Sequence, residues 1–387
     1  MNDGLRGKVA AVGVGRLQYK RGRSPYNEKT LLIRAIVEAC EDAGVDPADV
    51  DGFVSYGDDR HNEPPRLVAE LGTKELRLST QIWGGGGTGL THAMEVAAAM
   101  IAVGHARNVI VFRALAQGNT GRMGAAVMDH MVNDHYTGAG IGTPAQFLAL
   151  RARRIIEEHK VPASAVEALI RADYYHASNN PEAVAYGQDF TIEDYRNSRM
   201  VAEPFRLFDC SRENDGAATI LLTSSERAKD MRQKPVYIIG AEYGLGKGRG
   251  ELYENDPDYA SNGNDVAANR LWERTGLTID DMDCCQVYEN FSYLGLTALV
   301  EHGFSSWENL AENFTFENLI APGGKLPVNT SGGHLAEGFI HGMNVSIEAV
   351  RQLRGQSSNP VPGARTCLLI GGPGAPSGSM VLANELI

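Results

Sequence analysis

The chain has 387 residues, of which 43% are hydrophobic and 22% are charged, an ordinary balance for a globular protein. A chain of this length can bury a large core, and its length alone suggests two or three domains. The formal net charge of −12 argues against general nucleic-acid binding, because such binding depends on neutralising phosphates with basic side chains.

Cysteine use and apolar runs narrow the class further. There are 5 cysteines, an odd number without CxxC spacing, which argues against a disulfide framework or a zinc site. No apolar run reaches the length that crosses a membrane, and no signal-like apolar stretch follows Met1. We therefore expect a cytoplasmic protein without membrane contact.

Two parts of the chain repeat one order of elements. Residues 29–43 have the pattern of an amphipathic helix, and a glycine turn then leads to a strand ending at Tyr56. In the second part, a helix ending near Thr275 leads through a similar glycine turn to a strand ending at Tyr288. This order favours a duplicated unit.

The similarity continues downstream. Gly89 and Gly338 are each expected to open a helix, and each helix leads to an apolar strand, 108–113 in the first part and 366–371 in the second. Helices that alternate with apolar strands predict an α/β protein with a largely buried mixed or parallel sheet.

An insertion interrupts the first unit. It spans roughly residues 115–203 and contains two helical patterns, 143–159 and 164–176. We predict an N-terminal half, 1–230, that carries this insertion, and a C-terminal half, 231–387.

A glycine-rich loop precedes the helix at Gly89. Residues 82–89 read Ile-Trp-Gly-Gly-Gly-Gly-Thr-Gly and lead into an alanine-rich amphipathic run. The start of a helix carries unpaired N–H groups and partial positive charge, which stabilise thiolates and oxyanions. The backbone N–H groups of Gly86 and Gly87 are therefore candidate oxyanion donors.

The order of the motifs resembles the thiolase superfamily, and within it the sterol-carrier and lipid-transfer branch. The resemblance covers nearly the whole chain. It rests on the glycine-rich turn before residue 89 and on the segments 209–218, 287–291, 329–333 and 370–374. It implies a thiolase fold, with two duplicated α/β halves in αβαβα layers, an inserted loop domain and a homodimer.

The chain departs from the family at four catalytic positions. The nucleophilic cysteine falls near Gly86, and the second catalytic cysteine falls near Leu369. Tyr288 takes the place of an oxyanion-binding Asn or His, and Phe339 takes the place of a catalytic histidine. These changes together argue against Claisen-type acyl transfer.

The pattern is similar to the thiolase-like aldolases of bacterial steroid side-chain breakdown, which also lack the cysteines. This resemblance implies retro-aldol cleavage of a bulky, steroid-type β-hydroxyacyl-CoA to a shorter acyl-CoA and a ketone or aldehyde. Coenzyme A would be part of the substrate, without a further cofactor or metal. A small OB-fold partner with a zinc ribbon is also implied. A tyrosine stands at the position of Phe339 in that branch, so this chain implies a different base or substrate subtype.

The loss of cysteine is compatible with this chemistry. Thiolysis and retro-aldol cleavage share the enolate of a CoA thioester, and both require donors at the thioester oxygen. Only thiolysis requires a sulfur nucleophile. Retro-aldol cleavage instead requires a base for the β-hydroxyl proton and an acid for the enolate carbon.

Four side chains are candidates for these proton transfers. Tyr288 is the first, although a packed strand-end tyrosine is the alternative, since Tyr56 holds the equivalent place. Tyr293 is expected at a helix start, where it would line the same site or serve the core or a dimer. His334 follows a Gly-Gly pair and is the simplest base at neutral pH, with a structural role in the loop as the alternative. His341 matches a histidine of the first half, two residues into its helix, which favours packing.

For the charged residues near the motifs, the sequence gives only weak indications of a functional role. Glu289 and Glu337 flank the motifs and either could orient a base, but the default expectation for both is a surface or capping position. Lys247 and Arg249 follow a glycine-rich stretch and Arg154 lies on an insertion helix, so these three are candidates for binding the phosphates of CoA. A solvated helix face is the alternative for Arg154.

Two other functional classes remain open. A non-catalytic acyl-CoA or lipid carrier would agree with the lipid-transfer branch. An acyltransferase with another nucleophile, Ser331 or Cys210, is the third interpretation, and no Gly-x-Ser-x-Gly elbow supports it.

Overall fold

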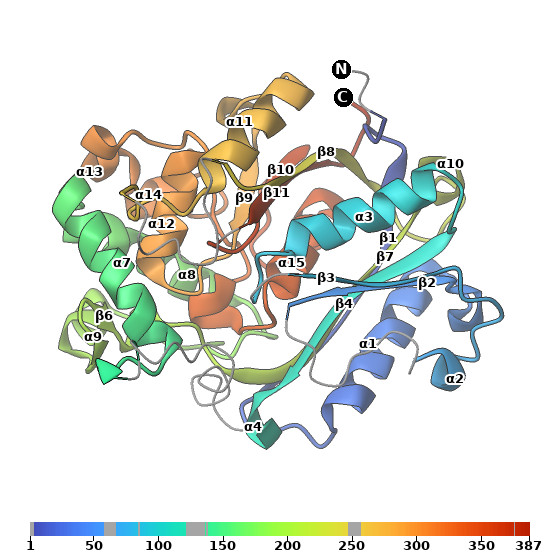
Figure 1. Ribbon diagram of the computed structural model, residues 1–387, viewed down its shortest axis with the longest axis horizontal. Helices are drawn as coiled ribbons and strands as arrows, with labels where there is room; N and C mark the ends of the chain where they lie inside the picture. Colours follow the sequence, from blue (N-terminus) through green and yellow to red (C-terminus); the bar gives the residue numbers. More distant parts are fainter. Residues whose placement is uncertain are drawn as a thin grey trace.

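The computed structural model describes residues 4–57, 67–83, 86–120, 136, 138–246, 257–374 and 376–387. Within these residues, the chain forms a nine-stranded mixed sheet in the order β3-β2-β4-β7-β1-β8-β11-β10-β9 (Figure 1). The strands are β1 (Val9–Lys20), β2 (Gly52–Tyr56), β3 (Leu78–Ile82), β4 (Asn108–Ala116), β7 (Asn214–Ser224), β8 (Val236–Gly244), β9 (Cys284–Val287), β10 (Thr366–Ile370) and β11 (Ser377–Ala383). A separate hairpin pairs β5 (Met200–Ala202) with β6 (Phe205–Arg206).

Each half of the chain supplies a contiguous part of this sheet. The five strands from β3 to β1 come from the first half, and the four from β8 to β9 come from the second. The two parts meet where β1 pairs with β8, at Ala10 with Tyr237 and Ala11 with Val236. The boundary predicted near residue 230 falls between β7 and β8.

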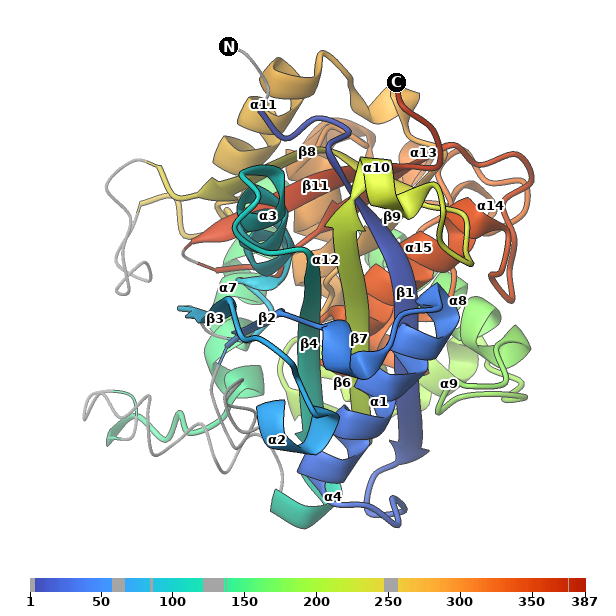
Figure 2. The ribbon, with the colours of Figure 1, turned by 90° about the vertical axis from the view of Figure 1, so that its right-hand side faces the viewer.

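Five long helices form the layers around the two parts of the sheet. α1 (Glu28–Ala43) covers the outer face of the first part. α3 (Leu90–Ala102) and α15 (Met343–Arg354) contact strands of both parts and form the central layer. α11 (Asn264–Thr275) and α12 (Ser292–Glu301) pack on the second part (Figures 1 and 2). The expected αβαβα order is confirmed.

The insertion forms a helical unit beside the second half. Its helices are α4 (Gln117–Thr120), α7 (Pro144–His159), α8 (Ala163–Asn179) and α9 (Ile192–Asn197). α8 packs against α12 and against the turn Gly333–Glu337, so the insertion contacts a motif of the opposite half. The remaining short helices are α2 (Val68–Leu71), α10 (Ser225–Ala228), α13 (Leu310–Asn313) and α14 (Phe316–Leu319). Single turns of 3-10 helix lie at Pro47–Asp49, Leu207–Asp209, Ile279–Asp281 and Trp307–Asn309.

Local signals explain most helix boundaries. α1 starts at Asn27, whose side chain accepts from the backbone N–H of Thr30, and it ends at Gly44 in the left-handed conformation. α11 ends at Gly276 in the same way. The turns recognised in the sequence are therefore helix caps.

One predicted helix start is wrong. The segment after Gly338 is not helical, and α15 begins at Met343 with Gly342 as its N-cap. Gly333–Glu337 instead forms a single π-type turn. His341 thus lies before α15, with a positive φ of 46°, and is not two residues into a helix. The repeat is preserved in its elements but not in this local alignment.

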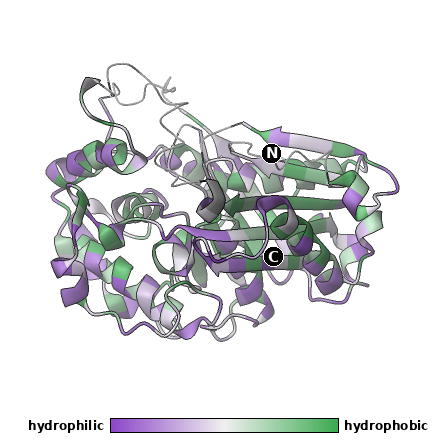
Figure 3. Ribbon diagram, turned by 90° about the horizontal axis from the view of Figure 1, so that it is seen from below, coloured by the Kyte–Doolittle hydropathy of each residue, from purple (hydrophilic) through white to green (hydrophobic). Residues whose placement is uncertain are grey.

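The apolar residues follow the layers. Figure 3 shows the strands of the interior as mostly hydrophobic and the helices as hydrophobic on one side. In the part of the chain that the structure describes, no helix combines the length and the apolar character needed to cross a membrane. The same residues contain no group of three or more His, Cys, Asp or Glu side chains that could hold a metal ion.

One buried carboxyl predicts a measurable pH dependence of stability. Glu301 on α12 accepts from the Ser261 hydroxyl at 2.7 Å and the Asn262 N–H at 2.9 Å. Burial raises its pKa from an ordinary 4.5 to about 7, although these hydrogen bonds lower it. Between these pH values the folded protein keeps a proton that the unfolded chain releases, so rising pH lowers stability by about 1.4 kcal/mol per pH unit.

Glu301→Gln should remove this contribution. Urea unfolding between pH 4 and 8 should show the wild type losing stability relative to the variant from about pH 4.5 to 7. Above about pH 7, the difference in unfolding free energy between the wild type and the variant should be constant. A difference that does not change with pH would contradict the proton uptake by folded Glu301.

Candidate functional site

The ring of Tyr288 lies against the glycine-rich turn that precedes α3. Gly86 has a φ of 54°, and a Cβ at this position would lie 3.3 Å from the Tyr288 hydroxyl. A Cβ at Gly87 would overlap the Tyr288 ring itself. The ring therefore occupies the space that a side chain at 87 would need, and its hydroxyl lies close to Gly86, so the structure brings two of the predicted site elements together.

Two further glycines bring backbone close to the same ring. A Cβ at Gly342 would lie 2.9 Å from Tyr288 Cδ2, and one at Gly372 would lie 3.2 Å from Cδ1. Only 3% of Tyr288 is exposed. Backbone from the α3 turn, the α15 start and the segment after β10 thus fixes this tyrosine in position.

Three other rings gather around Tyr288. The centroid of the His334 ring lies 4.5 Å from that of Tyr288, and Phe339 lies 6.0 Å from Tyr288 and 5.3 Å from His334. The centroid of the His341 ring lies 5.0 Å from that of Phe339. Leu115 of β4 joins Tyr288 and Phe339 in an apolar cluster. Phe339, where the resemblance places a catalytic histidine, therefore lies among the candidates.

His334 is fully buried in the π-type turn Gly333–Glu337. Its backbone N–H donates to Glu289 Oε1, and its ring Nδ1 lies 3.5 Å from Glu289 Oε2. Neither ring nitrogen has a hydrogen-bond partner among the described residues. A buried imidazole with an available lone pair is suited to proton transfer.

His341 is held by Arg113, a residue that the sequence analysis missed. Arg113 Nε donates to His341 Nδ1 at 3.0 Å, and Arg113 Nη1 donates to the Tyr56 carbonyl at 3.0 Å. A guanidinium only donates, so Nδ1 must accept, and the neutral ring carries its hydrogen on Nε2. His341 is therefore a donor rather than a base. An arginine inside an otherwise apolar strand pattern was the available signal.

The default surface placement of Glu289 and Glu337 is wrong, because both side chains are fully buried. Glu337 forms an ion pair with Arg16 and accepts from the Ser331 hydroxyl at 2.7 Å. Burial alone would lower the pKa of Arg16. The carboxylates of Glu337 and Glu182 raise it by more than burial lowers it, so the pKa lies above its ordinary value. Buried charges of this kind require such partners.

Tyr293 lies apart from the other candidates. It is on α12, its ring centroid is 6.2 Å from that of Phe205, and both rings belong to the main hydrophobic core. Burial raises the pKa of Tyr293 to about 12. The structure thus places it in the core, where the alternative interpretation had put it.

Of the three proposed phosphate-binding residues, the structure describes Arg154 alone. Lys247 and Arg249 lie outside the described residues. Arg154 is on α7 with 52% of its side chain exposed, and its Nε lies 2.6 Å from Glu158 Oε2. This is the arrangement of a solvated helix face, and CoA binding by Arg154 stays a prediction.

The contact between Gly87 and Tyr288 predicts a specific packing cost. In Gly87→Ala the new Cβ meets the ring, and overpacking of this kind costs about 1–3 kcal/mol of unfolding free energy. Gly323→Ala is the control, because its Cβ would meet nothing within 4 Å. Urea unfolding should show the loss in Gly87→Ala only. Equal effects in both variants would contradict the described packing.

Comparison with known proteins agrees with this architecture. Residues 249–384 match the family model "Thiolase C-terminal domain-like". The chain is 36% identical to 17-hydroxy-3-oxo-4-pregnene-20-carboxyl-CoA lyase of Mycobacterium tuberculosis, over 98% of this chain and 100% of that protein. It is 32% identical to the steroid side-chain-cleaving aldolase of Thermomonospora curvata, over 98% of this chain and 99% of that protein.

A solved structure of a related aldolase is similar to this chain in fold and sequence. The structure of the Ltp2-ChsH2(DUF35) aldolase superposes with a TM-score of 0.90 at 31% identity and covers 98% of both chains. The two relatives and the solved structure each cover 98% of this chain, and the family model matches its C-terminal part. The chain therefore belongs to the thiolase superfamily, in the group of thiolase-fold carbon–carbon lyases that these aldolases represent.

Proposed function

We propose that this enzyme cleaves a steroid β-hydroxyacyl-CoA by a retro-aldol reaction. The name of the M. tuberculosis relative supplies the first substrate to test, 17-hydroxy-3-oxo-4-pregnene-20-carboxyl-CoA. In that compound the hydroxyl on C17 is β to the thioester carbonyl, and C20 is the α carbon. Loss of the hydroxyl proton, formation of the C17 carbonyl and cleavage of the C17–C20 bond give a 17-ketosteroid and the enolate of propionyl-CoA.

The observation that carries this proposal is the position of Tyr288. Its hydroxyl lies beside Gly86, where the thiolase resemblance places the nucleophilic cysteine. A phenol cannot form the thioester intermediate of thiolysis, but it can donate or relay a proton. The site therefore has a group that can transfer a proton at the position where thiolases have a nucleophilic thiol.

The enolate oxygen requires donors. The backbone N–H groups of Gly86 and Gly87 have no acceptor among the described residues, and they lie next to the start of α3. The Nε2–H assigned to His341 is a further donor near the Tyr288 cluster. One such donor is worth about 3 kcal/mol of transition-state stabilisation.

His334 and Tyr288 carry out the proton transfers in this proposal. His334 is the base in this proposal, because both of its ring nitrogens lack a hydrogen-bond partner in the described part of the chain. Tyr288, with its ring 4.5 Å from that of His334, relays the hydroxyl proton to the imidazole. The resulting imidazolium then protonates C20 of the enolate. Coenzyme A enters this scheme only as part of the substrate.

A cleavage assay tests the reaction directly. The wild type should release propionyl-CoA and the 17-ketosteroid, and Tyr288→Phe should lower kcat about 100-fold or more, because the relay is lost. Chromatography of the CoA esters measures the acyl-CoA product, and extraction of the steroid measures the ketone. Tyr237→Phe, a buried tyrosine of β8, is the matched control and should keep its activity.

The same assay separates the alternative functions. A carrier would bind CoA esters without cleaving any member of a β-hydroxyacyl-CoA panel, and that result would reject the lyase proposal. An acyltransferase would accumulate a covalent acyl-enzyme on Ser331 or Cys210, visible by mass spectrometry. Burial raises the pKa of Cys210 to about 12, which disfavours the thiolate that such chemistry requires.

We also propose a homodimer and a complex with a small OB-fold, zinc-ribbon protein. β3 is the last strand of the described sheet, and Trp83, directly after it, is 93% exposed. An open sheet edge beside an exposed aromatic ring favours a protein interface. The solved relative carries a double name, Ltp2-ChsH2, which supports a second component.

Light scattering tests the assembly. The protein should have twice the chain mass of 41.8 kDa, and Trp83→Asp should weaken the association. Val103→Asp, at another exposed apolar residue, should not. A wild type of 41.8 kDa would contradict the homodimer. Co-expression with a small CxxC-containing OB-fold protein from an adjacent gene tests the second component by co-purification.

A further inference from the structure

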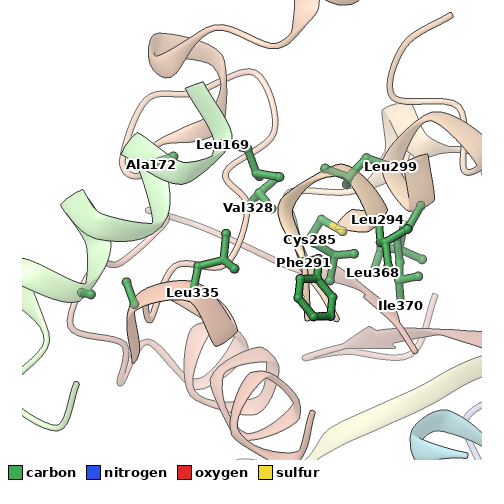
Figure 4. Close-up of a cluster of buried hydrophobic side chains, with 14 of the residues drawn as sticks. Leu169, Ala172, Cys285, Phe291, Leu294, Leu299, Val328, Leu335, Leu368 and Ile370 are labelled. Carbon is green, nitrogen blue, oxygen red and sulfur yellow. The ribbon is translucent and has the colours of Figure 1, made fainter. Parts of the chain in front are cut away.

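The insertion brings a buried carboxyl next to the site. Asp173 on α8 is fully buried, and α8 packs directly on the turn before His334, since a Cβ at Gly332 would lie 2.5 Å from Ala177 Cβ. Figure 4 shows α8 beside this turn, with Leu169 pointing toward Val328. A residue from the insertion therefore reaches the motifs of the C-terminal half.

Asp173 and Glu289 are neighbours without a cation. Burial raises the pKa of Asp173 well above its usual range, and the Glu289 carboxylate, within hydrogen-bond range, raises it further, whereas the Asn329 side chain lowers it by less. No described Arg or Lys forms an ion pair with either carboxyl. Glu337, by contrast, is paired with Arg16. Two adjacent buried carboxyls without a cation cannot both be ionised, so the pair holds a proton.

Glu289 also holds His334 at two points. Its Oε1 accepts the backbone N–H of His334, and its Oε2 lies 3.5 Å from Nδ1. Gly333 allows this approach, because a Cβ there would lie 2.9 Å from the Glu289 carboxyl carbon and still closer to Oε1. The carboxylate is thus fixed on the Nδ1 side of the imidazole, and the other nitrogen faces away from it.

We propose that Asp173 and Glu289 form a carboxyl pair that shares one proton and positions His334. Asp173 keeps the proton and donates it in a hydrogen bond to the Glu289 carboxylate, and the negative charge of Glu289 holds the imidazole hydrogen on Nδ1. Nε2 is then left unprotonated, as a base requires. No net proton is gained or lost by the pair during a turnover. The catalytic consequence rests on the proposed lyase function, whereas the tautomer itself does not.

Glu289→Gln tests the positioning. The carboxamide oxygen can still accept the His334 backbone N–H, but its NH2 group then faces Nδ1 and makes that nitrogen the acceptor. The imidazole hydrogen should move to Nε2, and kcat should fall about 100-fold or more while KM changes less than about threefold. Glu348→Gln, at another buried carboxyl that accepts from Thr330 and Ser357, should keep its kcat.

Two substitutions of Asp173 separate the shared proton from packing. Asn at this position offers an N–H donor to Glu289 and should keep kcat within about threefold. Ala offers no donor to Glu289, so the hydrogen bond that supports the carboxylate charge beside His334 is lost, and kcat should fall at least about tenfold. Equal activity of Asp173→Asn and Asp173→Ala, with both variants folded, would overturn the shared proton.

Nitrogen NMR of labelled histidines tests the tautomer without turnover. The His334 resonances are identified by their loss in His334→Gln. The wild type should show a protonated Nδ1 and an unprotonated Nε2, and Glu289→Gln should reverse this pattern. The same tautomer in both proteins would overturn the inference even if the lyase assay succeeds. A failed lyase assay with the expected tautomers would reject only the proposed function.

Discussion

The packing of the Tyr288 ring on the Gly86–Gly87 turn is the contact on which the account depends. A side chain at Gly87 and the Tyr288 ring would need the same space, and a side chain at Gly86, which has a φ of 54°, would press on the phenol hydroxyl. The positive φ of Gly86 and the nearby phenol hydroxyl both disfavour a side chain at the position of a thiolase cysteine. The same packing also places the phenol hydroxyl beside the start of α3, where N–H groups are available to an oxyanion.

Five separate parts of the chain are needed to form this arrangement. The turn before α3 and the end of β4 come from the first half, with Leu115 as the contribution of β4. Tyr288 follows β9, and the segment from His334 to His341 precedes α15. The insertion adds α8. The αβαβα layers bring these ends together, because both central helices contact both parts of the sheet.

Much of the fold could be predicted because its signals are local. Glycine caps, amphipathic periods and apolar strand runs each depend on a few neighbouring residues, and the ends of α1 and α11 and the start of β4 follow them. The start of α15 was misplaced because the preceding π-type turn is set by packing on α8, which no local pattern records. Motif order, rather than composition, carried the thiolase resemblance.

The site was predictable only where a residue stood at a recognised motif. Tyr288, His334 and Phe339 were found in this way, and the structure brings them together. Arg113 and Asp173 lie on a strand and a helix whose patterns indicate only burial, and their partners are distant in sequence. Glu289 was expected at the surface because an isolated carboxylate is costly to bury, and its neighbours became visible only in three dimensions.

The central claim is that an enolate forms at this site without a sulfur nucleophile. Turnover of the pregnene-carboxyl-CoA substrate in D2O, followed by mass spectrometry of the released acyl-CoA, tests it most directly. The account predicts one deuterium at the α carbon of propionyl-CoA in each turnover and no acyl group bound to the protein. A product without deuterium, or a covalent acyl-enzyme that forms at the rate of turnover, would contradict it.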